Sequence, residues 1–413
     1  MKRFFVLITL AILCLSFVSL VSLAMAAQQA EAWSNFHGYI AHTGYVNTVG
    51  PSTNKTIWTF NAGGGIWSSP AVADGIVYFG SFNHNFYAVK VSDGTKAWQF
   101  DAHGIIYSSP AVSNGVVFFG SDDRNVYALN AQTGDLVWNF TTGGQVQGSP
   151  TVAGGIVYIG SNDRYLYALS ETNGSKIWQF QTQGDVISSP AMANNIVYFG
   201  SYDHQVYAVD ALTGAQKWAY QTGSVVESSP AVANGMVYVG SFDNQTYALN
   251  ADTGKLVWKV LTGYEQCVQD SPGFANGVVY TGGSFDNNVY ALDATTGAAK
   301  WHYTTGGGVY TAPAIIGNVE YVSSLDNKTY ALNAQSGDFI WSYQTGGNIY
   351  SSPAVVNGVV YFGSYDGNLY AIGGNTAGTT SNQGIPSTIY FAILAVVLVV
   401  IIVVAIVVIR RRH

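Results

Sequence analysis

Carboxylates that recur at one position of a repeated phrase are the side chains best suited to chemistry in this chain. Each lies two residues after a serine, and the set is Asp123, Asp163, Asp203, Asp243, Asp286, Asp326 and Asp366. A ring of oxygen ligands could suggest calcium, but carboxylates from separate copies would lie too far apart to share one ion at about 2.3–2.6 Å. Turn residues follow each aspartate, and Asp side chains commonly bond the backbone of their own turn. We therefore predict that these aspartates cap turns.

Patterns typical of catalysis do not occur elsewhere in the sequence. His84, His103 and His204 belong to no His-x-Glu, HExxH or CxxC spacing, and no Ser-His-Asp set can be nominated. After the N-terminal apolar stretch the chain has one cysteine, Cys267, so no internal disulfide can form. We therefore predict no catalytic residue and no metal ligand.

A phrase repeated eight times predicts the elements that position these side chains. Each copy has a proline after a small residue, at Pro70, Pro110, Pro150, Pro190, Pro230, Pro272, Pro313 and Pro353. Within a copy, short β-branched and aromatic runs are separated by turn pairs such as Asn234-Gly235 and Thr253-Gly254. Four short strands joined by tight turns, repeated about every forty residues, are typical of a propeller blade. The expected fold class is all-β, an eight-bladed β-propeller with four antiparallel strands per blade.

Proline and tryptophan order the strands within a blade. Because proline has no N–H for a sheet ladder, we expect its strand to be innermost, with a free edge along the central channel. A tryptophan recurs on the last strand of each unit, which we place outermost, where its ring would wedge between blades. The last copy lacks such a strand, whereas residues 56–61, around Trp58, have no blade before them. We therefore predict that residues 56–61 close the ring as the fourth strand of blade eight.

One residue in each copy precedes the small-residue-Pro step, at the mouth of the channel. It varies between copies, unlike the core positions, and the set is Trp67, Tyr107, Gln147, Ile187, Glu227, Gln269, Tyr310 and Tyr350. The four aromatic residues belong to blades one, two, seven and eight, which are contiguous in a closed ring and would form one arc. Positions that do not repeat for packing are free to form a binding funnel. The alternative is that these side chains only fill the channel.

Blade six departs from the repeat by two extra residues before its proline. The insertion places Glu265, Cys267 and Asp270 on one irregular loop, and such loops on rigid scaffolds often carry sites. Glu265 and Asp270 would join Glu227 of blade five in an acidic arc beside the aromatic arc. The predicted ligand- or partner-binding residues are Trp67, Tyr107, Glu227, Glu265, Asp270, Tyr310 and Tyr350.

A second set of side chains follows the Gly-Ser step on the same face. These residues either form an exposed aromatic rim or pack one turn against the next, and they are Phe82, Asp122, Asn162, Tyr202, Phe242, Phe285, Leu325 and Tyr365.

The two ends of the chain predict its location. Residues 1–26 resemble a secretory signal with an Ala24-Met25-Ala26 cleavage site, and residues 27–55 lead into the propeller at 56–373. Residues 374–388 are small and polar, which suits a flexible stalk. Residues 389–409 carry no charge and at about 1.5 Å per residue would span a bilayer core of about 30 Å as a transmembrane helix. Arg410 begins a basic tail, 410–413, which we expect to be cytoplasmic, with the propeller extracellular or periplasmic in a single-pass cell-membrane protein.

The charge balance limits the kinds of partner. All 23 acidic residues lie between the two apolar ends. Of the 16 basic residues, Lys2, Arg3 and the three C-terminal arginines lie outside this part, so it holds 11 basic residues and has a formal charge of 11 − 23 = −12. A net negative, charge-poor surface argues against nucleic acid as a partner.

Five Asn-x-Ser/Thr sequons either accept glycans or arise by chance from the composition: Asn54, Asn139, Asn173, Asn244 and Asn327.

The copies resemble the pyrroloquinoline-quinone-type (PQQ-like) propeller repeat. The resemblance rests on phrases such as LNAQTGDLVW at 129–138 and LNADTGKLVW at 249–258, and on WSNFHGYIAHTGYV at 33–46, which is similar to the segment that precedes such propellers. It covers residues 33–373. One branch implied by the resemblance holds the quinone and a calcium ion in the propeller mouth, typically beside adjacent cysteines and a catalytic Asp. Cys267 is alone, so the chain departs from that branch.

The other branch is non-catalytic and includes the lipoprotein that helps to assemble outer-membrane proteins. The chain differs from that lipoprotein in its C-terminal apolar segment and in lacking a lipidation motif, and looks most like a membrane-anchored surface member. We therefore expect non-catalytic binding or scaffolding at the cell surface, without a cofactor. The expected partners are other surface proteins or carbohydrate, with the membrane contacted through residues 389–409. The alternative is a PQQ-dependent dehydrogenase with calcium.

Overall fold

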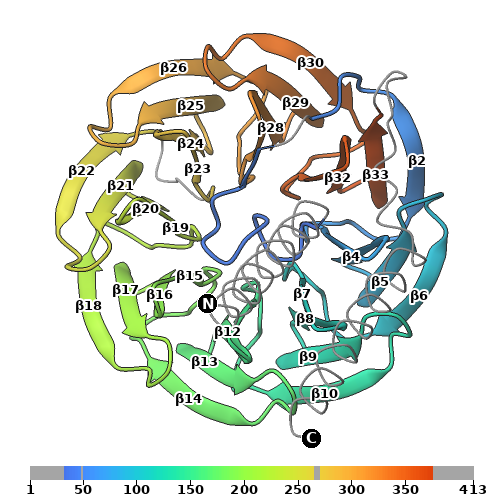
Figure 1. Ribbon diagram of the computed structural model, residues 1–413, viewed down its shortest axis with the longest axis horizontal. Coiled ribbons are helices and arrows are strands. Elements are labelled where there is room, and N and C mark those ends of the chain that lie inside the picture. The colour runs from blue at the N-terminus through green and yellow to red at the C-terminus, as the bar shows by residue number, and fades with distance from the viewer. Residues whose placement is uncertain (1–31, 48–49, 265–269, 375–413) are drawn as a thin grey trace, which may run out of the picture. The chain divides into compact units, whose positions relative to one another are not determined.

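The strands form a closed ring of eight four-stranded blades, as predicted (Figure 1). The computed structural model describes residues 32–47, 50–264 and 270–374. Several predicted features lie outside these residues: the signal peptide, most of the stalk, the transmembrane segment, the cytoplasmic tail and Glu265. Within the described residues, no helix is long and apolar enough to cross a membrane.

Blades one to four follow one another along the chain. Blade one contains β3 (Ala71–Ala73), β4 (Ile76–Gly80), β5 (Asn85–Lys90) and β6 (Lys96–Asp101). Blade two contains β7 (Ala111–Ser113), β8 (Val116–Gly120), β9 (Asn125–Asn130) and β10 (Leu136–Thr141). Blade three contains β11 (Thr151–Ala153), β12 (Ile156–Ser161), β13 (Tyr165–Ser170) and β14 (Lys176–Gln181). Blade four contains β15 (Ala191–Ala193), β16 (Ile196–Gly200), β17 (Gln205–Asp210) and β18 (Gln216–Gln221).

Blades five to eight complete the ring. Blade five contains β19 (Ala231–Ala233), β20 (Met236–Ser241), β21 (Gln245–Asn250) and β22 (Leu256–Leu261). Blade six contains β23 (Gly273–Ala275), β24 (Val278–Gly282), β25 (Asn288–Asp293) and β26 (Ala299–Thr304). Blade seven contains β27 (Ala314–Ile316), β28 (Val319–Ser324), β29 (Lys328–Asn333) and β30 (Phe339–Gln344). Blade eight contains β31 (Ala354–Val356), β32 (Val359–Gly363), β33 (Asn368–Gly373) and, from the other end of the propeller sequence, β2 (Thr56–Asn61).

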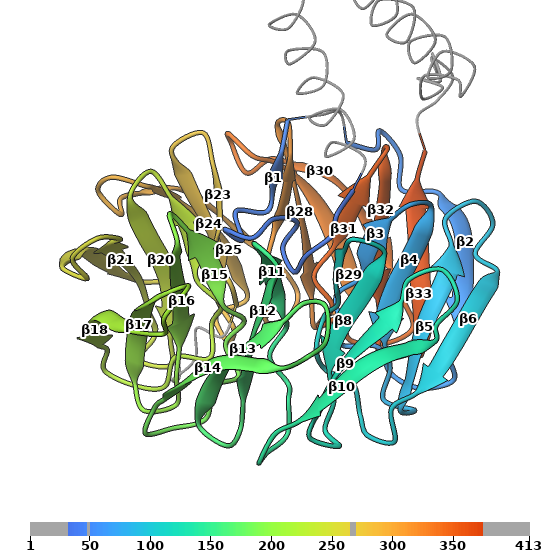
Figure 2. The same cartoon turned by 60° about the horizontal axis from the view of Figure 1, so that its bottom comes forward.

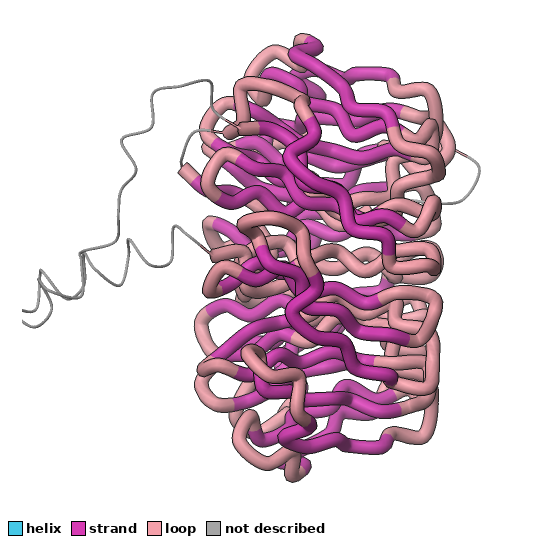
Figure 3. The backbone as a smooth tube through the Cα atoms, turned by 90° about the vertical axis from the view of Figure 1, so that its right-hand side faces the viewer, coloured by secondary structure: helices cyan, strands magenta, loops and turns pink. Residues whose placement is uncertain are grey.

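Strand β2 closes the ring, which confirms the predicted closure and its boundaries. It pairs antiparallel with β33, and Thr59 lies opposite Tyr370. The strand that follows each proline is innermost and the tryptophan strand is outermost, as expected. The turns and connecting loops gather on the two faces of the propeller (Figure 3).

The tryptophans join each blade to the next. In seven cases the indole Nε1–H donates to a backbone carbonyl of the following blade at 2.8–3.1 Å, as Trp98 does to Ala131. The ring lies against a glycine of that blade: a Cβ at Gly94, whose φ is +72°, would come within 2.7 Å of the Trp58 ring. The recurring Thr-Gly pair is therefore required both by the turn and by the tryptophan beside it.

A ring of serine hydroxyls joins the blades at the channel. The N–H of Ser69 donates to Oγ of Ser109 in the next blade, and seven such bonds of 2.9–3.0 Å run around the axis. Ala312 stands where the eighth hydroxyl would accept from Ser271. These buried bonds each contribute about 1 kcal/mol, and they fix the radius at which the residues of the mouth are held.

Residues 33–46 run inside the channel and correct the expectation that the innermost strands have free edges (Figure 2). Carbonyls of this segment accept N–H groups from the innermost strands of six blades, for example Ser34 from Val112 and Ala41 from Val232. Strand β1 (Tyr45–Val46) then pairs in parallel with β27. The prediction was wrong because an edge is left free only if no other part of the chain reaches it, and sequence periodicity cannot show that.

Ring closure can be tested by deletion. Removing residues 34–62 eliminates β2 together with the channel segment, so blade eight should have three strands and an open edge, and the protein should aggregate in light scattering. Removing residues 34–46 alone keeps β2 and should give a monomer with a lower melting temperature. The closure assignment fails if the longer deletion remains monomeric with an unchanged melting temperature.

Candidate functional site

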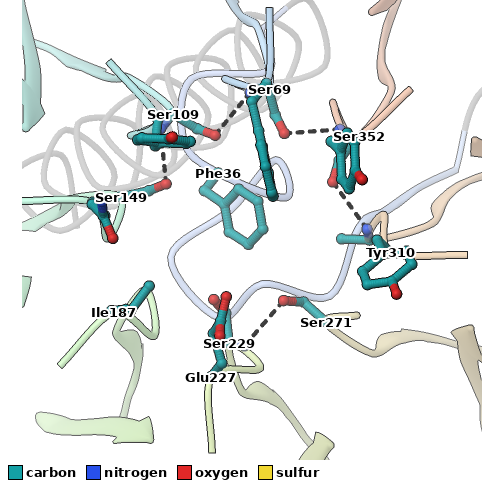
Figure 4. A pocket seen from close by; sticks show the side chains of 15 residues that line it. Phe36, Ser69, Ser109, Ser149, Ile187, Glu227, Ser229, Ser271, Tyr310 and Ser352 are labelled. Atoms are coloured by element: carbon teal, nitrogen blue, oxygen red, sulfur yellow. Dashed lines mark hydrogen bonds between the residues drawn. The ribbon is translucent and has the colours of Figure 1, made fainter. Parts of the chain in front are cut away.

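A cavity of about 320 Å³ lies on the channel axis, at the mouth predicted from the sequence (Figure 4). Its wall consists of mouth residues from seven blades, its lower ring consists of the channel serines, and Phe36 of the channel segment closes it. The lining comprises Phe36, Trp67, Ser69, Tyr107, Ser109, Gln147, Ser149, Ile187, Glu227, Ser229, Ser271, Tyr310, Ala312, Tyr350 and Ser352. We call this cavity the funnel.

The four predicted aromatic residues form one continuous arc. Trp67 and Tyr350 stack with ring centroids 4.1 Å apart and planes 22° apart. Tyr107 stands edge-on to Trp67 at 5.4 Å, and Tyr310 lies 5.7 Å from Tyr350 with its plane turned by 58°. All four side chains are half-buried. Contacts between neighbouring blades, which the sequence order implied, therefore bring together residues almost 300 positions apart.

The second set of aromatic residues buttresses this arc. Phe82 lies edge-on to Tyr107 at 4.8 Å and to Tyr365 at 5.3 Å, which matches the expectation that one turn packs against the next. Phe285 and Tyr365 are nevertheless 52% and 43% exposed, so the rim also presents apolar surface. Both interpretations of this set describe part of the structure.

The opposite side of the funnel carries the polar groups. The hydroxyl of Tyr202 donates to the carboxylate of Glu227, and the side-chain amide of Gln147 donates to Asp122 at 3.0 Å. Partial burial raises the pKa of Asp122 and the nearby Asp123 raises it further, while the Gln147 bond opposes the shift. No Lys or Arg occurs among the described residues that line the funnel. The lining is therefore aromatic on one side and acidic or amide-bearing on the other.

Two buried histidines anchor the channel segment beneath the funnel. His37 Nε2 donates to the Pro313 carbonyl, and His42 Nε2 lies 3.2 Å from the Thr151 hydroxyl. Burial lowers the pKa of His37 to about 4 and that of His42 to about 3. Both are therefore neutral at physiological pH. Phe36 packs edge-on against His42 at 5.4 Å and is held beneath the mouth.

Phe36 is a site residue that the sequence analysis missed. Its segment carried a signal, because residues 33–46 contain two histidines and four aromatic residues without belonging to any blade. Its place in the channel could not be read from that signal, since it depends on hydrogen bonds to strands up to about 270 residues away.

The recurring aspartates cap their turns, which confirms the prediction. In all seven turns one carboxylate oxygen accepts the N–H two residues later, at 2.9–3.2 Å, as Asp123 does from Asn125. The other oxygen of Asp123 accepts from the Tyr127 hydroxyl. These carboxylates therefore stabilise the turns of the blades.

Asp270 does not enter the funnel, contrary to its place in the predicted acidic arc. It is fully buried, and its carboxyl group accepts the Gly282 N–H and the Thr281 hydroxyl. In blade five the same backbone position is bonded by Ser228, whose hydroxyl accepts from Gly240. Asp270 thus replaces a scaffold serine, and of the predicted acidic residues only Glu227 is placed in the funnel by the described structure.

A second buried carboxyl group lies near Asp270. Glu320, on β28, is fully buried where the other seven blades have valine, and neither of its carboxyl oxygens has a hydrogen-bond partner. Burial and the charge of Asp270 raise the pKa of Glu320 well above its usual value. Burial likewise raises the pKa of Asp270 to about 8. Asp270 is therefore mainly protonated in the folded protein at neutral pH, and burial favours the neutral form of Glu320 as well.

The fold and the axial funnel define an eight-bladed β-propeller with a cavity at one end of its channel. The family profile described as "Outer membrane protein assembly factor BamB" matches residues 37–106, 88–189, 183–273 and 267–388, and the chain belongs to this PQQ-like repeat family. No curated protein matches the chain.

Solved structures with this fold differ widely in what they do. BamB from Moraxella catarrhalis is 21% identical with a TM-score of 0.68, covering 78% of this chain and 100% of its own. The quinohemoprotein alcohol dehydrogenase ADHIIG from Pseudomonas putida HK5 is 16% identical with a TM-score of 0.75, covering 87% and 82%. The computationally designed Ika8 protein is 17% identical with a TM-score of 0.70, covering 78% and 100%. At these identities the likeness shows the fold alone.

The buried carboxyl pair predicts an unusual dependence of stability on pH. Because folding raises both pKa values, the folded state holds protons that the unfolded chain releases, and the contribution of these two groups to stability should fall as pH rises from about 4 toward 8. His37 and His42 act in the opposite direction, but only below pH 6.5, where they would be protonated in the unfolded chain. Between pH 6.5 and 8 each carboxyl group should therefore lower the free energy of unfolding by about 1.4 kcal/mol per pH unit while it keeps its proton.

Glu320→Val, which restores the residue of the other blades, should raise the melting temperature at pH 8 and reduce its pH dependence. Glu320→Gln keeps the volume without the ionisation, and should flatten the dependence with a smaller gain in stability. Thermal unfolding of all three proteins at pH 6.5 and 8 measures the effect. Equal slopes in the wild type and both variants would contradict it.

Proposed function

We propose that the chain is a non-catalytic binding or scaffolding protein of the cell surface, whose ligand or partner enters the funnel. The observation that carries the proposal is the aromatic arc of Tyr107, Trp67, Tyr350 and Tyr310, which faces Glu227 across a closed-ended cavity. Packing alone would be served by any apolar side chains at these positions. An apolar wall with a few polar groups opposite is typical of a site that binds and orients a ligand.

The proposed location follows from the ends of the chain. The uncharged stretch at 389–409, followed by Arg410, supports a single membrane span with a cytoplasmic tail. The signal-like residues 1–26 support a propeller on the extracellular or periplasmic side. The proposed partners are therefore other surface proteins or carbohydrate, and the acidic balance of the chain disfavours nucleic acid.

The funnel does not fit the quinone and calcium of the dehydrogenase branch. A bound quinone carries carboxylates, which need cationic donors, and the described lining residues include no Lys or Arg but do include Glu227. Within the described residues, no group of three His, Cys, Asp or Glu side chains could hold a metal ion. Cys267 has no adjacent cysteine. These features favour the binding function over the dehydrogenase.

The binding function is tested by the double variant Trp67→Ala with Tyr350→Ala. This variant removes the stacked pair at the centre of the arc. Each aromatic contact contributes about 1 kcal/mol in addition to its buried area, so recovery of the partner from surface extracts should fall at least tenfold. The matched control is Leu212→Ala, at an exposed site away from the funnel. Melting temperatures must be measured alongside. If a folded double variant recovers its partner as well as the wild type does, the arc only fills the channel.

The dehydrogenase alternative is tested by calorimetry with PQQ and calcium. We expect no binding with a micromolar or lower dissociation constant, since the quinone carboxylates would face Glu227 and the described lining residues include no Lys or Arg. A quinoprotein dehydrogenase under the same conditions serves as the positive control. Micromolar or tighter binding by the present chain would favour the enzyme.

A further inference from the structure

The closed end of the funnel presents the face of an aromatic ring. Figure 4 shows the Phe36 ring roughly face-on at the middle of the lining residues, with Glu227 to one side. Phe36 is only half-buried, and its ring makes an edge-on contact with His42. The face of an aromatic ring carries partial negative charge, whereas its edge carries partial positive charge. The end of the funnel therefore adds to the negative potential that Glu227 creates.

The charges around the cavity select against anions. Glu227 lies in the wall and Asp122 lies behind Gln147, while the described lining residues include no cation of their own. An anionic ligand would meet a carboxylate in a partly dehydrated site, and the lining residues that the structure describes offer it no positive charge. A cation would instead gain both from the carboxylate and from the ring face.

Several hydrogen-bonding groups of the wall are already engaged, which leaves fewer of them for a polyhydroxylated ligand. The Gln147 amide already donates to Asp122 and accepts from Asn162, and each channel serine oxygen that joins two blades already accepts a backbone N–H. A sugar needs several groups to match its hydroxyls, because each unmatched hydroxyl costs about 1–3 kcal/mol when buried. An ammonium group needs a carboxylate and aromatic surface, and both are present.

The size of the cavity points to a small group. Its volume of about 320 Å³ is at the lower end of the range of about 300–1,000 Å³ found for ligand pockets. One side chain or one small molecule would fill it, whereas a folded surface would not enter.

We propose that the funnel binds an alkylammonium group, which lies over the Phe36 ring and pairs with Glu227. This inference rests on the proposed binding function and names its ligand chemistry. The ammonium group belongs either to a free quaternary amine or to a lysine side chain of a partner. Tyr202, whose hydroxyl donates to Glu227, is a positioning residue that holds the carboxylate toward the funnel.

The test is calorimetric titration of the full-length chain with three probes. Choline chloride carries the charge, 3,3-dimethyl-1-butanol is its neutral isostere, and N-acetyl-lysine methylamide represents a protein side chain. Choline or the lysine derivative should bind at least tenfold more tightly than the neutral alcohol. Tighter binding of choline indicates a small-molecule ligand, and tighter binding of the lysine derivative indicates a partner protein. Equal binding of all three probes, or binding of none, overturns the proposal.

Variants locate the site. Glu227→Gln should weaken ammonium binding about tenfold or more, and Phe36→Leu, which keeps an apolar side chain but removes the ring, should weaken it about tenfold. Leu212→Ala, at an exposed site that does not line the funnel, should bind as the wild type does. Unchanged affinity of Glu227→Gln overturns the proposal even if choline binds.

Failure of this inference differs from failure of the binding function. If the Trp67→Ala, Tyr350→Ala variant loses its partner but no ammonium probe binds, the funnel binds another class of ligand and only the ammonium proposal falls. If the same variant keeps its partner, the binding function itself fails, whatever the probes do.

Discussion

The ring of backbone-to-serine hydrogen bonds around the channel is the interaction on which the rest of the structure depends. Each bond uses a backbone N–H that the innermost strand of its own blade leaves unpaired, and directs it to the hydroxyl of the next blade, as Ser69 does to Ser109. A buried N–H without a partner costs about 1–3 kcal/mol, so at seven of the eight interfaces a blade cannot turn away from its neighbour without that loss. Two residues earlier in the chain, the mouth side chain is therefore held at a fixed radius. The funnel is thus a consequence of the way the ring closes.

The irregular blades show where the scaffold tolerates change. Ala312 interrupts the serine ring, Asp270 replaces a serine, and Glu320 replaces a valine, and all three belong to the neighbouring blades six and seven. Burial raises the pKa of both carboxyl groups and so favours their neutral forms, because a neutral acid loses far less hydration than a carboxylate. The remaining interfaces of the closed ring can offset the cost of one unusual interface.

The channel segment gives the propeller a floor. Without residues 33–46 the innermost strands would expose unpaired N–H groups along an open channel, and the mouth residues would surround a pore. Hydrogen bonds to six blades convert that pore into a cavity closed by Phe36. A partly enclosed cavity holds less water than an open channel, which strengthens the electrostatic contacts within it. The channel segment therefore makes the aromatic arc and Glu227 the walls of a cavity and not of an open pore.

The sequence by itself determined the blade number, the strand order, the closing strand β2 and the aromatic arc. Each follows from local periodicity together with ring closure: Trp67 and Tyr350 must be neighbours if blades one and eight are adjacent. The tertiary structure alone decided that Phe36 closes the funnel, that Asp270 is buried in the scaffold, and that Glu320 lies near it. Those placements depend on contacts between segments without periodic relation and on the direction in which one side chain turns. The insertion in blade six shifts the repeat register there, so the side-chain direction of Asp270 could not be inferred from the equivalent residues of the other blades.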